Sequence, residues 1–289
     1  MSFSGTSREI ADYYHHDLPA FLVRFPEAWP LEGIRYYGLS YVAGFVGAWL
    51  LLRLYFRARR SPLNPEQVTN LMFALIVGVA LGGRIGYMLF YDTADLLRDP
   101  LQLVRVWEGG MASHGGMIGV ALAALWVSRS EKIPFLQISD LACSVASLGI
   151  AFGRIANFIN GELWGKAAHV PWAVVFREYD SLTGQYLYTI PRHPSQLYQA
   201  ALEGLLLFAY IQFRFWRSRN LRFGRLTGEY LLGYALLRII AEQFRVPDAD
   251  LILGLSRGTF YSFFLFLVGG ICIYTSRDNP PHPAPQRGS

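Results

Sequence analysis

Residues 149–165 read GIAFGRIANFINGELWG, and this stretch decides how the chain is interpreted. It begins as the end of an apolar helix, yet it contains an arginine, two asparagines and a glutamate. Because a charge inside a membrane span is costly, Arg154 is a candidate functional residue; the alternative is an arginine that only extends to the interface from near a helix end. Residues spaced by four share one helix face, and small residues there predict close approach of a neighbouring backbone. The residues on this face are Gly149, Gly153, Asn157 and Gly161.

The composition is that of a membrane protein. Of the 289 residues, 53% are hydrophobic and only 16% are charged, which is too apolar for an ordinary soluble domain. Both cysteines fall in apolar spans, so we expect no disulfide framework, no metal site and no other cofactor. The net charge of +5 comes from arginines beside apolar stretches, which is typical of topology signals and contacts with membrane lipids. We therefore expect no nucleic-acid partner.

Seven apolar segments are long enough to cross a bilayer, and they predict an all-α, polytopic membrane protein. We expect a seven-helix transmembrane catalytic domain over residues 34–275, with an outer, periplasmic segment at about 160–193. The mixed aromatic and charged residues 1–33 favour an interfacial arm with a short amphipathic helix, and the proline-rich residues 276–289 favour a disordered tail. The segments lie near residues 36–56, 68–91, 111–127, 135–159, 194–213, 226–244 and 260–274.

Arginines in the short connections indicate the orientation. The connections after the first and fifth helices are dense in arginine and have no acid close to the spans. We therefore expect the N-terminus outside and the C-terminus in the cytoplasm. The arginines concerned are Arg53, Arg57, Arg59 and Arg60 in the first connection, and Arg214, Arg217, Arg219, Arg222 and Arg225 in the later one.

With this topology, the unusual polar side chains fall at one depth, toward the outer leaflet. Several arginines at headgroup depth favour a phosphate site, because guanidinium binds phosphate with bidentate geometry. His114 at the same level is a candidate general base, and His193 competes for that role. This set of polar side chains predicts a transferase for which phosphate is the leaving group. Its members are Tyr37, Arg84, His114, Arg154, Asn157, Glu162, Tyr234, Arg238 and Glu242.

Other interpretations fit parts of this pattern. Each arginine lies toward the C-terminal end of an outward-running helix, where the helix dipole favours cations, and Arg238 could simply pair with Glu242. Intramembrane arginines and glycine-interrupted helices also mark substrate paths, so a lipid or anion transporter is the alternative function. A purely structural membrane protein would explain the helices but not the convergence of arginines and amides.

Several stretches closely resemble the prolipoprotein diacylglyceryl transferase family of bacterial inner-membrane enzymes. The resemblance covers roughly residues 33–274 and includes the layout of the spans. Its longest and least common motifs are the glycine–arginine–asparagine stretch around Arg154 and the segment before the fifth helix. The stretches are RYYGLSY (35–41), LGGRIGYMLFY (81–91), RVWEGGMASHGGMIG (105–119), GRIANFINGELWGK (153–166), PRHPSQLY (191–198) and GYALLRIIAEQFRVPD (233–248).

The resemblance implies transfer of the diacylglyceryl group of phosphatidylglycerol to the lipobox cysteine thiol of a prolipoprotein. The products are a thioether and glycerol 1-phosphate. It also implies an enzyme of the bacterial inner membrane whose active site faces the periplasmic leaflet, and we expect a monomer. By matching motif positions, Arg154 and Arg238 correspond to headgroup-binding arginines of the family, and His114 to its essential histidine. Other functionally sensitive positions match Tyr37, Asn157, Glu162, Gly165, Tyr234 and Glu242.

The chain departs from the family pattern at a few positions. Gln199 stands where relatives often carry glutamate, so an acid at this position is not essential here. Arg257 and Thr259 replace the methionine and glutamine of the family near the start of the last helix.

Overall fold

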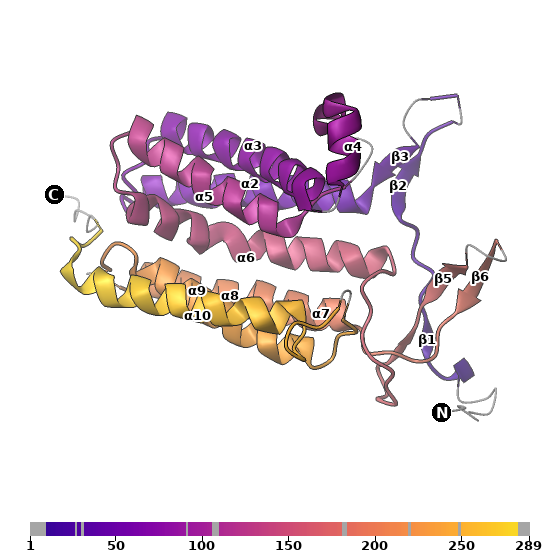
Figure 1. The fold of residues 1–289 in the computed structure, drawn as a ribbon. Coiled ribbons are helices and arrows are strands. Elements are labelled where there is room, and N and C mark those ends of the chain that lie inside the picture. The colour runs from indigo at the N-terminus through magenta and orange to yellow at the C-terminus, as the bar shows by residue number, and fades with distance from the viewer. Residues whose placement is uncertain are drawn as a thin grey trace. The chain divides into compact units, whose positions relative to one another are not determined.

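Each apolar segment expected from the sequence is helical in the computed structural model (Figure 1). The structure describes residues 10–26, 28–29, 32–90, 92–105, 110–180, 184–218, 221–247 and 250–282. The long helices are α2 (Tyr36–Arg57), α3 (Pro65–Phe90), α5 (Ser113–Ser130), α6 (Phe135–Ile159), α9 (Arg225–Glu242) and α10 (Arg257–Thr275). Between α6 and α9, a composite helix consists of α7 (Ser195–Gln199), the π-helix η3 (Ala200–Leu206) and α8 (Leu207–Arg217). Short helices are α4 (Thr93–Arg98), η1 (Pro100–Val104) and η4 (Ser276–Asp278).

Four helices in the described residues are long and apolar enough to cross a membrane. They are Tyr36–Arg57, Pro65–Leu89, Phe135–Ile159 and Arg257–Asp278. The apolar helix Gly115–Ser130 is shorter. The protein is therefore mostly helical and has the character of a membrane protein.

Short strands occupy the arm and the segment after α6. Strand β1 (Tyr14–His15) pairs in parallel with β4 (Val174–Val175), β2 (Phe21–Arg24) pairs antiparallel with β3 (Gly33–Arg35), and β5 (Arg177–Asp180) pairs antiparallel with β6 (Gln185–Tyr188). Strands β1, β2 and β3 were not expected in the arm, and residues 1–9, where part of the expected amphipathic helix could fall, lie outside the described residues. The partner of β1 lies about 160 positions later in the chain, which local propensity does not reveal, whereas β2 and β3 pair locally.

The chain divides into two compact units. The first comprises Met1–Val46, Ala146–Arg214 and Gly228–Ile271, and the second comprises Gly47–Val145, Phe215–Thr227 and Cys272–Ser289.

Within the second unit, glycines bring α3 and α5 into backbone contact. A Cβ atom at Gly86 would lie 2.7 Å from the Cα of Gly115, and one at Gly78 would lie 2.5 Å from the carbonyl oxygen of Gly119. The two helices run side by side in Figure 1. The glycines on these two helices therefore permit close helix packing.

In the first unit, the glycine face of α6 only partly behaves as expected. A Cβ at Gly44 would lie 3.2 Å from the Cα of Gly149, which confirms close approach there. At Gly153 a Cβ would meet no atom within 4 Å, so the expectation is wrong at that position. The tight contact lies instead at Ala151, whose Cα would be 2.7 Å from a Cβ at Gly204 of η3.

In the second unit, Asp140 joins three segments. Its carboxylate is fully buried and accepts hydrogen bonds from the backbone N–H of Gly224 (2.8 Å), from the N–H and hydroxyl of Thr227 (both 2.6 Å) and from His282 Nε2 (2.8 Å). The N–H of His282 also donates to the carbonyl of Leu221 at 2.7 Å. The tail, expected to be disordered from residue 276, is thus fixed as far as His282; residues 283–289 lie outside the described residues.

Replacing Asp140 tests this junction. Asp140→Ala leaves two buried backbone donors and a hydroxyl without an acceptor, so we expect a loss of about 3 kcal/mol in unfolding free energy. His282→Ala removes one of the four bonds and serves as the control, with an expected loss of about 1 kcal/mol. Thermal unfolding in detergent measures both, and equal losses would contradict the role given to Asp140.

Candidate active site

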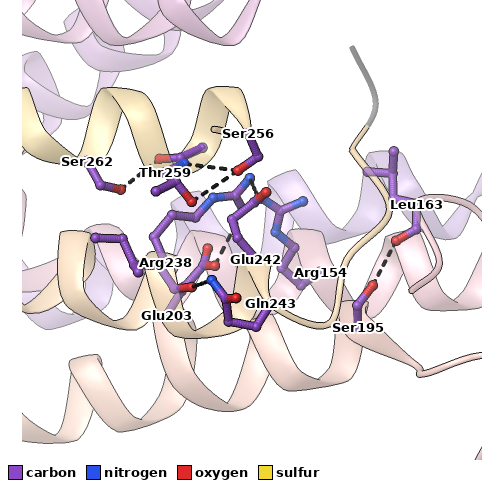
Figure 2. Close-up of polar contacts among 12 residues, drawn as sticks. Arg154, Leu163, Ser195, Glu203, Arg238, Glu242, Gln243, Ser256, Thr259 and Ser262 are labelled. Carbon is purple, nitrogen blue, oxygen red and sulfur yellow. Dashed lines mark hydrogen bonds and ion pairs between the residues drawn. The ribbon is translucent and has the colours of Figure 1, made fainter. Parts of the chain in front are cut away.

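Arg238 lies between two carboxylates of the first unit, with little of its side chain exposed. Its Nη1 is 3.4 Å from Glu203 Oε1, and its Nη2 forms an ion pair with Glu242 Oε1 one helical turn away on α9 (Figure 2). The exposed fractions of the side chains are 13% for Arg238, 0% for Glu203 and 5% for Glu242. Because a buried charge is costly without compensation, the two acids explain how the guanidinium is held in an apolar bundle.

The first turn of α10 packs directly on this ion pair. A Cβ at Gly258 would lie 2.6 Å from Glu242 Oε1 and 2.8 Å from Arg238 Nε, so only glycine fits without displacing them. The hydroxyl of Ser256 accepts a hydrogen bond from the N–H of Thr259 at 3.2 Å and so caps the helix (Figure 2).

Arg154 has a different environment. Among the described residues, its hydrogen bond runs from Nη1 to the amide oxygen of Asn157, at 3.4 Å, and no carboxylate pairs with it. The amide nitrogen of Asn157 donates to Glu162 Oε1 at 2.7 Å. Arg154 is therefore oriented by an amide that is itself oriented by an acid, and its charge remains available for an anion.

Two tyrosines connect these groups. Tyr234 on α9 is close enough to interact electrostatically with Arg154, Arg238 and both acids of the ion-pair cluster. Tyr37 on α2 interacts in the same way with Arg154 and Glu162. The structure thus brings together seven of the residues selected from the sequence: Tyr37, Arg154, Asn157, Glu162, Tyr234, Arg238 and Glu242.

Gly165 acts through its backbone. Its N–H donates to the carbonyl of His193 at 2.9 Å, and a Cβ would lie 2.5 Å from the carbonyl oxygen of Phe244 and 2.7 Å from the Cβ of His193. Glycine is therefore required where three segments of the first unit meet.

His193 lies in an aromatic cluster beside Gly165. Its Nδ1 is 3.1 Å from the hydroxyl of Tyr198, which accepts a hydrogen bond from Trp172 Nε1 at 2.7 Å. The His193 ring packs edge-on against Phe244. Burial lowers the pKa of His193 below the ordinary histidine value, which favours the neutral imidazole at pH 7.

Arg84 and His114 belong to the second unit. The guanidinium of Arg84 is buried and donates to the carbonyl of Gln102 at 2.5 and 3.1 Å and to that of Gly110 at 3.4 Å. These bonds tie α3 to η1 at Gln102 and to Gly110, which precedes α5. His114 lies in the first turn of α5, but its side chain is outside the described residues.

The family model described as prolipoprotein diacylglyceryl transferase matches residues 26–275. The chain belongs to this family.

Relatives named phosphatidylglycerol--prolipoprotein diacylglyceryl transferase agree along most of their length. The protein of Zymomonas mobilis is 42% identical over 248 residues, which are 84% of each chain. That of Legionella pneumophila is 45% identical over 224 residues, 77% of this chain and 82% of the relative. That of Bradyrhizobium diazoefficiens is 38% identical over 283 residues, 92% of this chain and 98% of the relative.

Sequence reasoning missed two residues of this candidate site, Glu203 and Gly258. Glu203 was not selected, although an acid within the apolar run AALEGLL (200–206) is the kind of residue that marks a functional span. Gly258 gave no local signal, because its contact with Arg238 and Glu242 exists only in the folded chain. No group of three His, Cys, Asp or Glu side chains suited to a metal ion occurs in the described part of the chain.

Gly258→Ala tests the packing of α10 on the ion pair. The added methyl group overlaps Glu242 and Arg238, so we expect at least about a tenfold loss of transferase activity. Gly270→Ala lies on the same helix, where a Cβ would meet nothing within 4 Å, and should keep full activity. The folded fraction, measured by size-exclusion chromatography in detergent, should match for the two variants. Equal activities would contradict the account.

Proposed function

We propose that this chain transfers the diacylglyceryl group of phosphatidylglycerol to the lipobox cysteine thiol of prolipoproteins. The cysteine sulfur forms a bond to the carbon of the diacylglyceryl group that bears the phosphate. The bond between that carbon and the phosphate oxygen breaks, and glycerol 1-phosphate leaves. Family membership gives the substrates, since relatives over most of the chain carry this activity in their names. No observation favours a lipid or anion transporter.

The proposed chemistry rests on a difference between the partners of the two arginines. Arg238 is paired with Glu203 and Glu242, whereas Arg154 is hydrogen-bonded to an amide. In our proposal, Arg154 binds the lipid phosphate and stabilises the charge that develops as glycerol 1-phosphate departs. Arg238 belongs to the same site, where Glu203 and Glu242 fix its position.

Further groups complete the proposed site. Asn157 and Glu162 orient Arg154, Tyr37 and Tyr234 interact with the charged groups, and the His193 carbonyl bonded to Gly165 shapes the outer edge. Arg84 contributes to substrate binding by holding the segment before His114. We place seven spans in the bacterial inner membrane, with the N-terminus outside and the site toward the periplasmic leaflet, and we propose that the enzyme acts as a monomer.

The proton of the attacking thiol needs a base. We propose His114 for this role, as its place in the family motif implies, and His193 remains the alternative, held by Tyr198 near Gly165. An imidazole with a pKa near the working pH is suited to take a thiol proton.

Arg154→Ala tests the phosphate site. Removing a donor that stabilises a developing oxyanion typically costs about 3 to 4 kcal/mol, so we expect at least about a hundredfold loss of turnover. The assay follows the mass of a lipobox peptide and the released glycerol phosphate with phosphatidylglycerol in detergent. Arg217→Ala, on an exposed side chain of α8, is the control. Full activity of Arg154→Ala would disprove the assignment, and absence of a peptide adduct with the unaltered protein would disprove the function.

The pH dependence of turnover separates the two histidines. A general base must be unprotonated, so activity falls as the pH drops through its pKa. We expect His114→Gln to lose about a hundredfold in turnover and the acidic limb of the profile. Burial lowers the pKa of His193, so a limb due to this residue would lie below the ordinary histidine range and vanish in His193→Gln. An unchanged profile in His114→Gln would contradict its role.

A further inference from the structure

Two fully buried side chains at the start of α7 are bonded to the loop that carries Glu162. Gln196 Nε2 donates to the carbonyl of Glu162 at 2.5 Å, and the hydroxyl of Ser195 donates to the carbonyl of Leu163 at 3.1 Å (Figure 2 shows the second bond). Both side chains have an exposed fraction of 0%. They belong to the PRHPSQLY motif, whose serine and glutamine have no role in the site described so far.

The loop needs such bonds because its backbone is strained. Leu163 has φ +58°, a left-handed conformation that is unfavourable for a residue other than glycine. Gly161, two residues earlier, has φ +68°. A strained residue persists only where its surroundings fix it, and here Ser195 and Gln196 supply two of the fixing contacts.

From this loop, hydrogen bonds lead to Arg154 without interruption. The carboxylate of Glu162 accepts from the amide nitrogen of Asn157 at 2.7 Å, and the amide oxygen of Asn157 accepts from Arg154 at 3.4 Å. The sequence Gln196–Glu162–Asn157–Arg154 therefore forms one relay of contacts within the first unit. A shift of the Glu162 backbone would rotate the amide that orients the guanidinium.

We propose that Ser195 and Gln196 are positioning residues that set the lipid-phosphate site by acting through Glu162 and Asn157 on Arg154. This inference rests on the proposed function, because it assigns Arg154 to the phosphate. Neither residue touches the lipid. Their effect is on how well the site fits the phosphate, so it falls on the KM for phosphatidylglycerol rather than on that for the peptide.

The chain contains matched controls for both residues. Gln199 lies one turn later, is also 0% exposed, and has no hydrogen-bond partner for either amide atom among the described residues. Ser147 on α6 is 1% exposed, and its hydroxyl is likewise unpaired within the described ranges. Replacing these two tests burial and shape alone, since no bond to the loop is lost.

The experiment compares Gln196→Met with Gln199→Met, because methionine preserves the length of the side chain and removes the donor. We expect Gln196→Met to raise the KM for phosphatidylglycerol about tenfold, since a buried carbonyl loses its partner. The KM for the lipobox peptide should stay within about twofold of the unaltered protein. Gln199→Met should leave both constants unchanged.

A second comparison, Ser195→Ala against Ser147→Ala, applies the same test and decides the question if Gln196→Met does not fold. Equal changes in each pair, or a loss of active protein with an unchanged lipid KM, would overturn the proposal.

Native mass spectrometry measures the affinity for phosphatidylglycerol without turnover. If the unaltered protein transfers nothing, the proposed function fails, whereas a weakened lipid affinity confined to Gln196→Met and Ser195→Ala would still support the relay.

Discussion

A guanidinium group inside an apolar bundle must be compensated, and the arrangement of the first unit follows from how Arg238 meets that requirement. Glu242 pairs with it within α9 and Glu203 pairs with it from η3, so the second ion pair also links these two helices. The same compensation makes Arg238 a poor partner for a further anion. Arg154, held by an amide instead, keeps its positive charge available. One site thus contains a structural arginine and an arginine suited to a phosphate.

Glycines allow the helices that carry these charges to come close enough. Gly204 brings η3, with the adjacent Glu203, against Ala151 of α6, less than one turn from Arg154. Gly258 lets α10 cover the ion pair from another side. The π-helix itself is a rare element that often marks functional sites, and here it presents a buried acid to the arginine. The small residues therefore allow the close helix packing that brings the charged side chains of the site together.

Much of this could be predicted from the sequence, because apolar length and costly polar groups are local signals. The helices and the selection of Arg154, Asn157 and Arg238 came from such signals. Strand β1 was not expected because it pairs with residues about 160 positions away, and the pairing of Glu203 with Arg238 was missed because the two lie 35 positions apart. Contacts of this kind depend on tertiary packing, which neither periodicity nor propensity encodes. The relay through Gln196 is of the same nature.

The central claim is that Arg154, rather than Arg238, receives the lipid phosphate. Cryo-electron microscopy of the protein in a phosphatidylglycerol nanodisc tests it most directly, because the phosphate is the densest part of the bound lipid. The account predicts phosphate oxygens within about 3 Å of the Arg154 guanidinium, with Arg238 still between Glu203 and Glu242. A phosphate bound to Arg238 in place of its carboxylates, with Arg154 bonded only to Asn157, would contradict it.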